Sequence, residues 1–352
     1  MDQSIITASS PPLIAPFRNY DSEIYAFGKR LGEEFQAETL TRAFTHSSFF
    51  ERTTEPVVPP ASSEHNELLI ENGERIASEY VLAYLRFHFP RLPEEGIRAF
   101  HDWLLSQEVL SNVAQHLGVA DLVRSRDFPV EQATLCTTFK AVVGALCHDS
   151  GQKRAEEFVL DLVLPQLIGV ELSELWIFRY PLHVLEALYE KEQKAKPEPR
   201  LIRSTGSLTI MPVYIVGMYV DKELIGEAPG ETVEIAKEMA ARDALRNLWG
   251  LNEDREPFRF GAKGREIDLD PYRSTENQSL SDLCPEGTDF STKPPDDPDL
   301  LFDIEKEFNK YQTEVASKLP VVLRRQQRHK FSRGSIARKS LRRLIRPQVY
   351  NI

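Results

Sequence analysis

The longest regular pattern of apolar positions in the chain lies in residues 65–90. Its apolar side chains recur at steps of three, four or seven residues, which places them on one face of an α-helix. These side chains are Leu69, Ile76, Tyr80, Tyr84 and Phe87. Because proline interrupts a helix, the pattern predicts one long helix that ends before Pro90.

The other face of this predicted helix carries a row of carboxylates near its start. Glu67, Glu71 and Glu74 follow one another at steps of four and three. Acidic residues are favoured near a helix N-terminus, so the row could be an ordinary solvated face. It could also be half of a divalent-metal site, because hard cations bind oxygen anions. The pattern alone leaves both interpretations open.

Helical periods continue on both sides of the long helix. They predict helices over residues 21–36, 38–46, 133–148 and 152–168, and one or two helices over 93–118. Asp21 or Ser22 is the expected N-cap of the first helix. No alternation typical of strands occurs before residue 200. We therefore predict an all-α domain over residues 20–170.

A second predicted domain, residues 178–251, differs in its pattern. A helix is expected over residues 181–194. Three short alternating segments, residues 201–203, 213–220 and 223–226, are typical of strands, with a hairpin turn at Asp221-Lys222. A strong helical pattern follows over 232–248. The predicted order is α-β-β-β-α, so the fold class as a whole is mostly α.

The charge distribution changes after residue 251. The net charge of the 352 residues is −11, but it is unevenly spread. Residues 266–305 hold twelve acidic residues against Arg273 and Lys293, whereas residues 321–352 hold ten Lys and Arg and no acidic residue. We predict an acidic linker over 252–306, mostly unstructured on its own, and a helix around 300–318 followed by an extended basic tail within 307–352.

Several classes of protein are excluded by composition. No run of about 18 apolar residues could span a membrane. Cys136, Cys147 and Cys284 lack the spacing of a disulfide framework or zinc site and fit a reducing compartment. The residues before Arg18 contain no Lys or Arg and include Asp2, so no mitochondrial transit peptide is visible.

The first domain resembles ribonuclease III in three stretches: LTRAFTHSSF (40–49), the region of Asn72-Gly73-Glu74, and FKAVVGALCHDSG (139–151). The second resembles a double-stranded-RNA-binding domain, most clearly in GEAPGETVEIAKEMAARDALRNL (226–248). The combination is similar to the ribonuclease III-type proteins of the animal mitochondrial large ribosomal subunit. This resemblance covers about residues 20–250.

Ribonuclease III cuts RNA with Mg²⁺ held by four carboxylates, two on the long helix and two on a later helix. The resemblance places these ligands at Ile70, Glu74, Thr137 and Lys140, of which only Glu74 is acidic. It therefore implies an inactive, degenerate site that holds no metal or cofactor. We predict that the Lys140 ammonium takes the place of the metal and pairs with Glu74. A single weakly held ion at Glu67 and Glu71 is the alternative.

The RNA-binding resemblance is degenerate in the same way. The family contacts phosphates with a lysine cluster at the start of its last helix. The matching positions here carry Val233 and Glu234, and only Lys237 remains, followed by Arg242. The loop over 206–212 also lacks the Gly-Pro pair and the histidine of the family. We therefore predict weak duplex binding and a role as a docking module.

The basic tail is the strongest remaining signal for nucleic acid, because clustered cations neutralise phosphates. A solvated tail without a partner is the alternative. With Lys237 and Arg242, the predicted RNA-binding residues are Arg324, Arg325, Arg328, Lys330, Arg333, Arg338, Lys339, Arg342, Arg343 and Arg346.

Three functions stay open on this sequence. The resemblance implies a non-catalytic structural protein of the mitochondrial large ribosomal subunit, in the matrix, with a part in subunit assembly or in the stability of emerging polypeptides. Its partners would be the large-subunit rRNA and neighbouring ribosomal proteins, and pairing with another ribonuclease III-like subunit is left open. A Mg²⁺-dependent double-stranded-RNA endoribonuclease and a free double-stranded-RNA-binding regulator are the alternatives.

Overall fold

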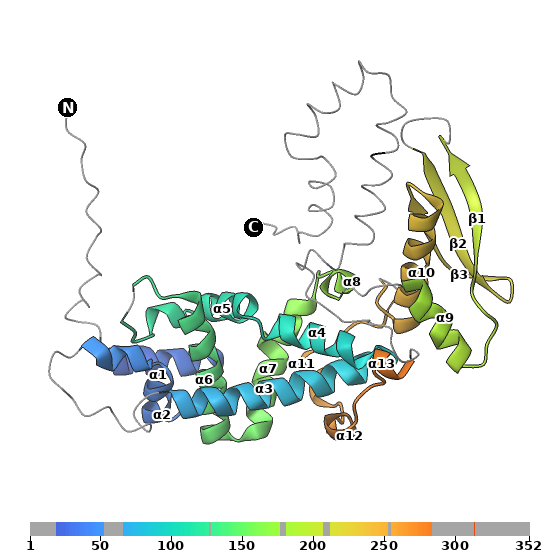
Figure 1. Ribbon diagram of the computed structural model, residues 1–352. Helices are drawn as coiled ribbons and strands as arrows, with labels where there is room; N and C mark the ends of the chain where they lie inside the picture. Colours follow the sequence, from blue (N-terminus) through green and yellow to red (C-terminus); the bar gives the residue numbers. More distant parts are fainter. Residues whose placement is uncertain are drawn as a thin grey trace, which may run out of the picture. The chain divides into compact units, whose positions relative to one another are not determined.

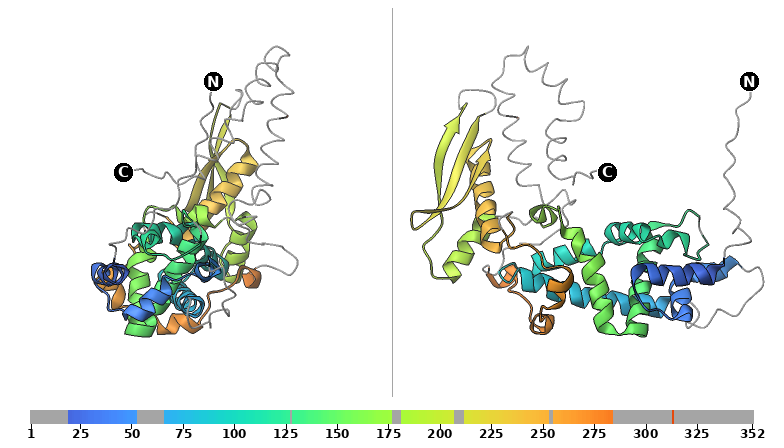
Figure 2. Two further views of the ribbon diagram at one scale, coloured as in Figure 1. Left: turned by 90° about the vertical axis from the view of Figure 1, so that its left-hand side faces the viewer. Right: turned by 180° about the vertical axis from the view of Figure 1, so that it is seen from behind.

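The structure is a computed structural model that describes residues 19–52, 66–126, 128–176, 181–206, 212–252, 255–283 and 313. Figure 1 shows the chain and Figure 2 gives two further views. The described residues form two compact units, which are treated separately below. The first contains the described residues among 1–84, 101–167 and 259–273, and the second contains the described residues among 85–100, 168–258 and 274–352.

The described part of the first unit is built from helices and contains no strand. It includes α1 (Tyr20–Leu31), α2 (Ala37–Ala43), η1 (Ser47–Arg52), most of α3 (Glu67–His88), the end of α4 (Glu94–Leu104), α5 (Gln107–His116), η2 (Val119–Asp121), α6 (Gln132–Ser150), α7 (Gln152–Leu162), η3 (Leu164–Leu167), α11 (Gly261–Arg265) and the start of α12 (Asp270–Ser274). This confirms the all-α prediction for these residues.

The core of the first unit lies along α3 and α6. Four of the apolar residues predicted for one face of the long helix are buried: Leu69, Ile76, Tyr80 and Tyr84. Helix α6 is buried along most of its length, including the predicted positions Leu135, Phe139, Val142, Val143 and Leu146. The helical period therefore identified the residues that form this core.

Two helix boundaries differ from the sequence prediction. The N-cap of α1 is Asn19, whose side chain accepts a hydrogen bond from the backbone N–H of Asp21. The helix ends at Gly32, which has φ 72°, rather than continuing to residue 36. The pattern over 93–118 divides into α4 and α5, and Ser106 caps α5.

The second unit contains the predicted α-β-β-β-α order. Helix α9 (Pro181–Lys191) is followed by β1 (Glu198–Thr205), β2 (Val213–Val220), β3 (Glu223–Gly230) and α10 (Val233–Trp249). The short helices α8 (Leu172–Leu175) and α13 (Leu280–Leu283) also belong to this unit. The strands form an antiparallel sheet in the order β1-β2-β3. Asp221 and Lys222 both have positive φ, as a tight hairpin turn requires.

Helix α10 covers one face of this sheet, as Figure 1 shows. Its buried side chains are small, including Ala236, Ala240 and Ala244. A Cβ placed on Gly226 of β3 would lie 2.5 Å from the backbone nitrogen of Ala244. The alanines and this glycine therefore let the helix approach the sheet backbone closely.

Residues 255–283 are folded, so the prediction of an unstructured linker is wrong for this part. In the first unit, the Tyr84 hydroxyl donates to the carbonyl oxygen of Arg259, and Arg273 pairs with Glu156 at 2.9 Å. In the second unit, the side-chain amide of Asn277 donates to the carbonyl oxygens of Phe89 and Leu92. A few specific anchors therefore order a stretch whose average composition is polar. Residues 284–306 and the basic tail lie outside the described residues.

Where the chain is described, no helix is long and apolar enough to cross a membrane. Cys136 and Cys147 are free thiols, and Cys284 lies outside the described residues.

Candidate functional site

The candidate site lies where α3 crosses α6. Gly73 on α3 and Gly144 on α6 let the two backbones touch at this crossing. A Cβ on Gly73 would lie 1.9 Å from the carbonyl oxygen of Lys140, and one on Gly144 would lie 2.0 Å from the carbonyl oxygen of Leu69. Neither position can hold a larger side chain without moving a helix. The crossing therefore fixes which residues face each other across the two helices.

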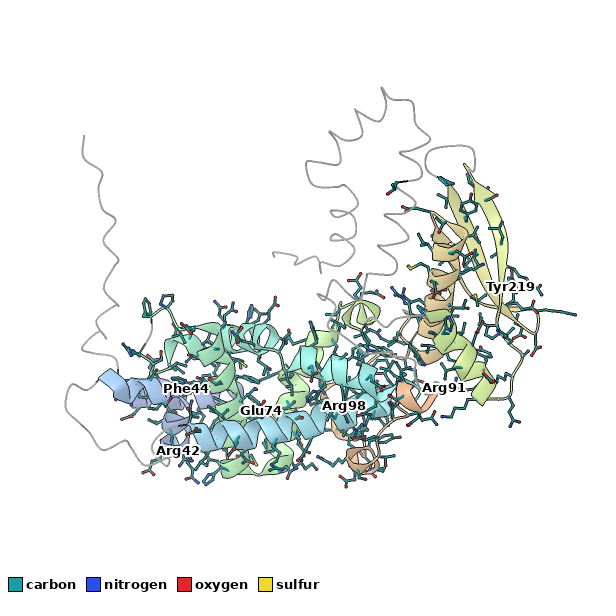
Figure 3. The ribbon with its side chains drawn as sticks, viewed as in Figure 1. Arg42, Phe44, Glu74, Arg91, Arg98 and Tyr219 are labelled. Atoms are coloured by element: carbon teal, nitrogen blue, oxygen red, sulfur yellow. The ribbon has the colours of Figure 1, made fainter. Side chains whose placement is uncertain are left out.

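Glu74 and Lys140 meet beside this crossing, and Figure 3 labels Glu74 on α3. The Lys140 ammonium lies 2.8 Å from the Glu74 carboxylate. The Lys140 side chain is 15% exposed and that of Glu74 is 54% exposed. The predicted ion pair is thus present. Cys136, one turn before Lys140, is buried, and this burial raises the pKa of its thiol despite the nearby ammonium.

The other two predicted ligand positions offer no carboxylate. Ile70 is half-buried, and the Thr137 hydroxyl donates within its own helix to the carbonyl oxygens of Ala133 and Thr134, each at 3.1 Å. Within the described ranges, no group of three or more His, Cys, Asp or Glu is placed to hold a metal ion. Mg²⁺ prefers several oxygen anions. A single carboxylate already paired with an ammonium does not fit such an ion.

Lys237 is the first of the two cations predicted to bind RNA within the described residues. It lies on α10 one turn after the N-cap Thr232, whose hydroxyl accepts from the N–H of Ile235 at 3.2 Å. The Lys237 ammonium pairs with Glu234 at 3.0 Å. The carboxylate of Glu234 is 71% exposed, so a phosphate approaching Lys237 would meet a like charge.

Arg242, the second cation, is half-buried on α10. Its Nε atom is buried and has no hydrogen-bond partner in the described part of the chain. Burial lowers the pKa of its guanidinium, and the nearby Glu238 opposes this change. Glu238 in turn accepts a hydrogen bond from the N–H of Leu182 at the start of α9. Arg242 thus lies among the packed parts of the domain, which does not favour a phosphate contact.

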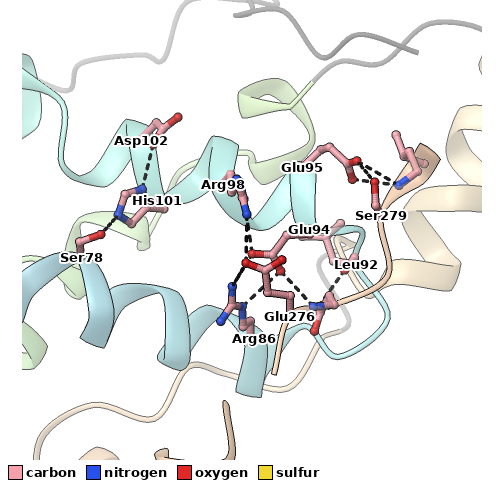
Figure 4. Close-up of polar contacts among 12 residues, drawn as sticks. Ser78, Arg86, Leu92, Glu94, Glu95, Arg98, His101, Asp102, Glu276 and Ser279 are labelled. Carbon is pink, nitrogen blue, oxygen red and sulfur yellow. Dashed lines mark hydrogen bonds and ion pairs between the residues drawn. The ribbon is translucent and has the colours of Figure 1, made fainter. Parts of the chain in front are cut away.

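Sequence reasoning missed a chain of hydrogen bonds that joins α3 to α4 in the first unit (Figure 4). The Ser78 hydroxyl lies 2.8 Å from Nε2 of His101, and Nδ1 of His101 lies 2.8 Å from Asp102. The order Ser-His-Asp resembles a hydrolase triad. However, Ser78 lies inside α3, where the neighbouring backbone N–H groups are used by the helix and cannot bind an oxyanion. These residues therefore act as a link between helices.

A buried ion pair in the second unit was also missed. Arg86 contacts Glu94 at 2.5 Å, and their side chains are only 5% and 6% exposed. Glu276 and Arg98, both about 60% exposed, extend the network to the surface, as Figure 4 shows. The backbone N–H of Asn277 also donates to Glu94. The charge of Glu94 therefore helps to hold the segment that follows the second domain. No local pattern in the sequence signals this pairing.

The predicted RNA-binding residues of the tail, from Arg324 to Arg346, lie outside the described residues, and so does most of the loop over 206–212. Of the predicted site residues, the structure describes the four positions at the helix crossing and the two cations of α10.

Comparisons with known proteins identify the family. Two family models match, one for the endonuclease domain of large ribosomal subunit protein mL44 over residues 19–146 and one for the MRPL44 dsRNA-binding domain over residues 176–284. The large ribosomal subunit protein mL44 of Caenorhabditis elegans is 35% identical over 350 residues, which cover 96% of this chain and 86% of that protein. The chain belongs to the mL44 family.

More distant relatives place the mL44 family near ribonuclease III. The large ribosomal subunit protein mL44 of Neurospora crassa is 32% identical over 112 residues, covering 32% of this chain and 25% of that protein. Ribonuclease 3 of Symbiobacterium thermophilum is 30% identical over 229 residues, covering 61% of this chain and 90% of that enzyme. The resemblance inferred from the sequence is thus confirmed, as is its mostly α architecture with a double-stranded-RNA-binding-like domain.

Proposed function

We propose that this chain is a structural constituent of the mitochondrial large ribosomal subunit and that it has lost the catalytic activity of ribonuclease III. The observation that carries this proposal is the 2.8 Å ion pair between Lys140 and Glu74. Ile70 and Thr137 add no anionic oxygen to it. Metal-assisted hydrolysis needs an ion that activates water and stabilises the leaving oxygen. An ammonium held by Glu74 can do neither.

The domain boundaries that accompany this proposal are residues 20–170 for the ribonuclease III-like domain and 178–251 for the RNA-binding-like domain. The partners are the mitochondrial large-subunit rRNA and neighbouring ribosomal proteins, and the location is the mitochondrial matrix. The ten cations from Arg324 to Arg346 would contact rRNA phosphates, which makes the interaction dependent on salt. The pairing of Lys237 with Glu234 favours this tail over α10 as the principal RNA contact.

Pairing with another ribonuclease III-like subunit is part of the same proposal. Leu68, on the first turn of α3, is 51% exposed. A partner subunit would bury this leucine, as apolar side chains are buried at the core of protein interfaces. A Leu68→Asp variant should lose the contact with the partner. The fold of the unit should be retained, because about half of the Leu68 surface is already exposed to solvent.

Sedimentation tests the structural role directly. Mitochondrial extracts would be fractionated on sucrose gradients at low and at high salt, and the chain followed by immunoblot. We expect it to travel with the large subunit at both salt concentrations, because a constituent is held by protein contacts as well as phosphates. A chain found only in the light fractions would instead support the free double-stranded-RNA-binding regulator.

The runner-up is a Mg²⁺-dependent endoribonuclease, which the relationship to ribonuclease 3 of Symbiobacterium thermophilum favours. The two functions differ in what the residues at the helix crossing must do. An enzyme needs a metal there, whereas a structural protein needs only a stable crossing. The side chains at the crossing supply a single carboxylate, Glu74, which is paired with Lys140, and this supports the structural role.

A further inference from the structure

One face of the sheet in the second unit carries exposed apolar side chains. Val216 and Met218 of β2 are buried. Gly226, the partner of Met218 on β3, lies against Ala244 of α10, so these residues face the helix. Successive strand residues point to opposite faces, so Gly217, between Val216 and Met218, belongs to the other face, the outer face of the sheet. Among the described residues, no helix lies against the outer face in either Figure 1 or Figure 2.

An apolar cluster surrounds Gly217 on the outer face. A Cβ on Gly217 would lie 2.7 Å from Ile202 of β1 and 2.8 Å from Leu224 of β3. The same Cβ would lie 3.0 Å from the ring of Tyr219 on β2. Ile202 and Leu224 are nevertheless 46% and 48% exposed, and Val213, four residues before Gly217 on β2, is 42% exposed. Because apolar side chains from three strands remain partly in water, the outer face suits contact with another molecule.

Charged side chains border the apolar cluster, and their charges cancel. The strand pairing places four of them on the outer face, because their partners on β2 belong to that face: Glu198, Arg200 and Arg203 on β1 and Glu227 on β3. Arg200 pairs with Glu198 at 2.7 Å, which leaves Arg203 as the excess charge on the β1 side. Glu227 is the charge on the β3 side. A partner would match this face with a carboxylate beside β1 and a cation beside β3.

The composition of the outer face favours protein over RNA as the partner. Surfaces that bind RNA need an excess of positive charge, and single strands stack their bases on exposed aromatic rings. Tyr219 is the only aromatic residue among the described strand positions of this face, and Arg200 already lies over its ring at 5.3 Å. Apolar side chains with no excess charge are instead typical of the buried centre of a protein interface.

The size of the outer face limits what can cover it. The strands have 8 residues each, which corresponds to a length of about 26 Å, and three strands span a width of about 14 Å. This footprint of roughly 360 Å² is about half of what one partner contributes to a stable protein interface. The face alone would therefore not hold a second copy of the chain. A single helix, with a diameter of about 10–12 Å, covers most of the width.

From these observations we propose that the outer face docks an amphipathic helix of a neighbouring protein of the large ribosomal subunit. The apolar stripe of that helix covers Ile202, Tyr219 and Leu224. One border of the stripe carries a carboxylate near Arg203, and the other border carries a cation near Glu227. This inference rests on the proposed structural function, because a face this small needs the other contacts of an assembly to keep its partner bound.

Hydroxyl-radical footprinting tests the proposal on the full chain, free in solution and within purified large subunits. Oxidation of Tyr219 is measured by peptide mass spectrometry, and protection is its rate in the free chain divided by its rate in the subunit. Because the docked helix covers the ring, the wild type should show severalfold protection. Each variant is compared with its own free form, so that a change in intrinsic reactivity cancels.

Two neighbouring residues of β1 provide a matched pair of variants. Ile202 lies in the apolar cluster, whereas Leu201 pairs with the buried Val216 and belongs to the other face. Their exposed fractions are similar, at 46% and 53%. Ile202→Asp should abolish the protection of Tyr219, because it places a carboxylate against the apolar stripe, and Leu201→Asp should retain it. Thermal unfolding followed by circular dichroism checks that both free variants are folded.

A charge reversal at Glu227 distinguishes a protein partner from RNA. This residue is exposed, so Glu227→Lys should leave the fold intact. The proposed helix carries a cation at this border, and the protection of Tyr219 should therefore fall severalfold. RNA phosphates would instead be attracted to the new lysine. Protection that is unchanged or stronger in Glu227→Lys would overturn the proposal.

Other occupants of the outer face give different results, and each of them overturns the proposal. If another segment of the same chain covers the face, Tyr219 is oxidised as slowly in the free chain as in the subunit. If a second copy covers it, oxidation of the free chain rises on dilution. Equal protection in Ile202→Asp and in the wild type excludes this face as the docking surface.

The same samples separate the docking proposal from the proposed function. A wild-type chain that is absent from purified large subunits contradicts both. A wild-type chain that sediments with the subunit while Tyr219 stays unprotected contradicts the docking proposal alone.

Discussion

Replacing Gly73 by alanine tests the helix crossing on which the candidate site depends. Alanine is normally the better helix former, by about 1 kcal/mol relative to glycine. Intrinsic propensity alone therefore predicts that Gly73→Ala stabilises the protein. The structure predicts the opposite, because the new methyl group would lie 1.9 Å from the carbonyl oxygen of Lys140 and 2.7 Å from the backbone nitrogen of Gly144.

The size of the effect follows from the contacts. A normal carbon–oxygen contact needs about 3.4 Å or more, so α3 and α6 would have to separate by about 1.5 Å. Both helices are buried along this crossing, and overpacked cores lose about 1–3 kcal/mol, occasionally more. An overlap of this size with backbone atoms belongs at the upper end of that range, about 3 kcal/mol. After subtracting the gain of about 1 kcal/mol in helix propensity, we expect Gly73→Ala to reduce the free energy of unfolding by about 2 kcal/mol.

Urea denaturation followed by circular dichroism would measure this change. Gly28→Ala in α1 is the matched control, because its nearest neighbours would be Phe35 at 3.3 Å and the Glu33 carbonyl at 3.6 Å. That variant should have unchanged or slightly increased stability. If Gly73→Ala were as stable as the wild type or more so, the close crossing would be refuted, and with it the reason why Glu74 meets Lys140.

Three further predictions concern charges. Arg86→Met removes the buried partner of Glu94, which then keeps, among the described residues, only Arg98 at 3.6 Å and the N–H of Asn277, and it should cost about 3 kcal/mol in urea denaturation. Arg98→Met, at the exposed end of the network, should cost less than about 1 kcal/mol. Lys140→Met should cost less than about 1 kcal/mol, because the Glu74 partner is largely hydrated, and it should produce no nuclease activity in an RNA cleavage assay. Burial raises the pKa of Glu231, so its contribution to stability is complete at low pH and is lost as pH rises through the folded pKa. Glu231→Gln should therefore gain stability relative to the wild type between about pH 4 and about pH 7, and parallel pH profiles would contradict this assignment.

The helical core could be predicted from the sequence because helical periodicity is a local signal. The recurrence of Leu69, Ile76, Tyr80 and Tyr84 identifies a buried face without any knowledge of what covers it. The meeting of Glu74 with Lys140 could not be derived from spacing, since the two residues are 66 positions apart. It was predicted only because the resemblance to ribonuclease III aligned both residues with one metal site.

The wrong prediction of an unstructured linker also has its cause in contacts between residues that are far apart in the sequence. The acidic stretch after residue 252 is polar on average, but Arg273 anchors it to Glu156 of α7 and Asn277 anchors it to the loop after α3. The average composition of a segment does not reveal single contacts of this kind. The RNA contact of Arg242 stays a prediction, and its half-buried position near Glu238 on α10 does not favour it. Which side of a helix is covered depends on its neighbours in the fold.

A cleavage assay on the purified chain tests the central claim most directly. A double-stranded RNA hairpin would be incubated with the wild type and with Glu74→Ala, with and without Mg²⁺. The Glu74 carboxylate that a metal would need is already paired with Lys140. We therefore predict that neither protein cleaves the hairpin faster than it is cleaved without protein. Mg²⁺-dependent cleavage by the wild type that disappears in Glu74→Ala would contradict the account.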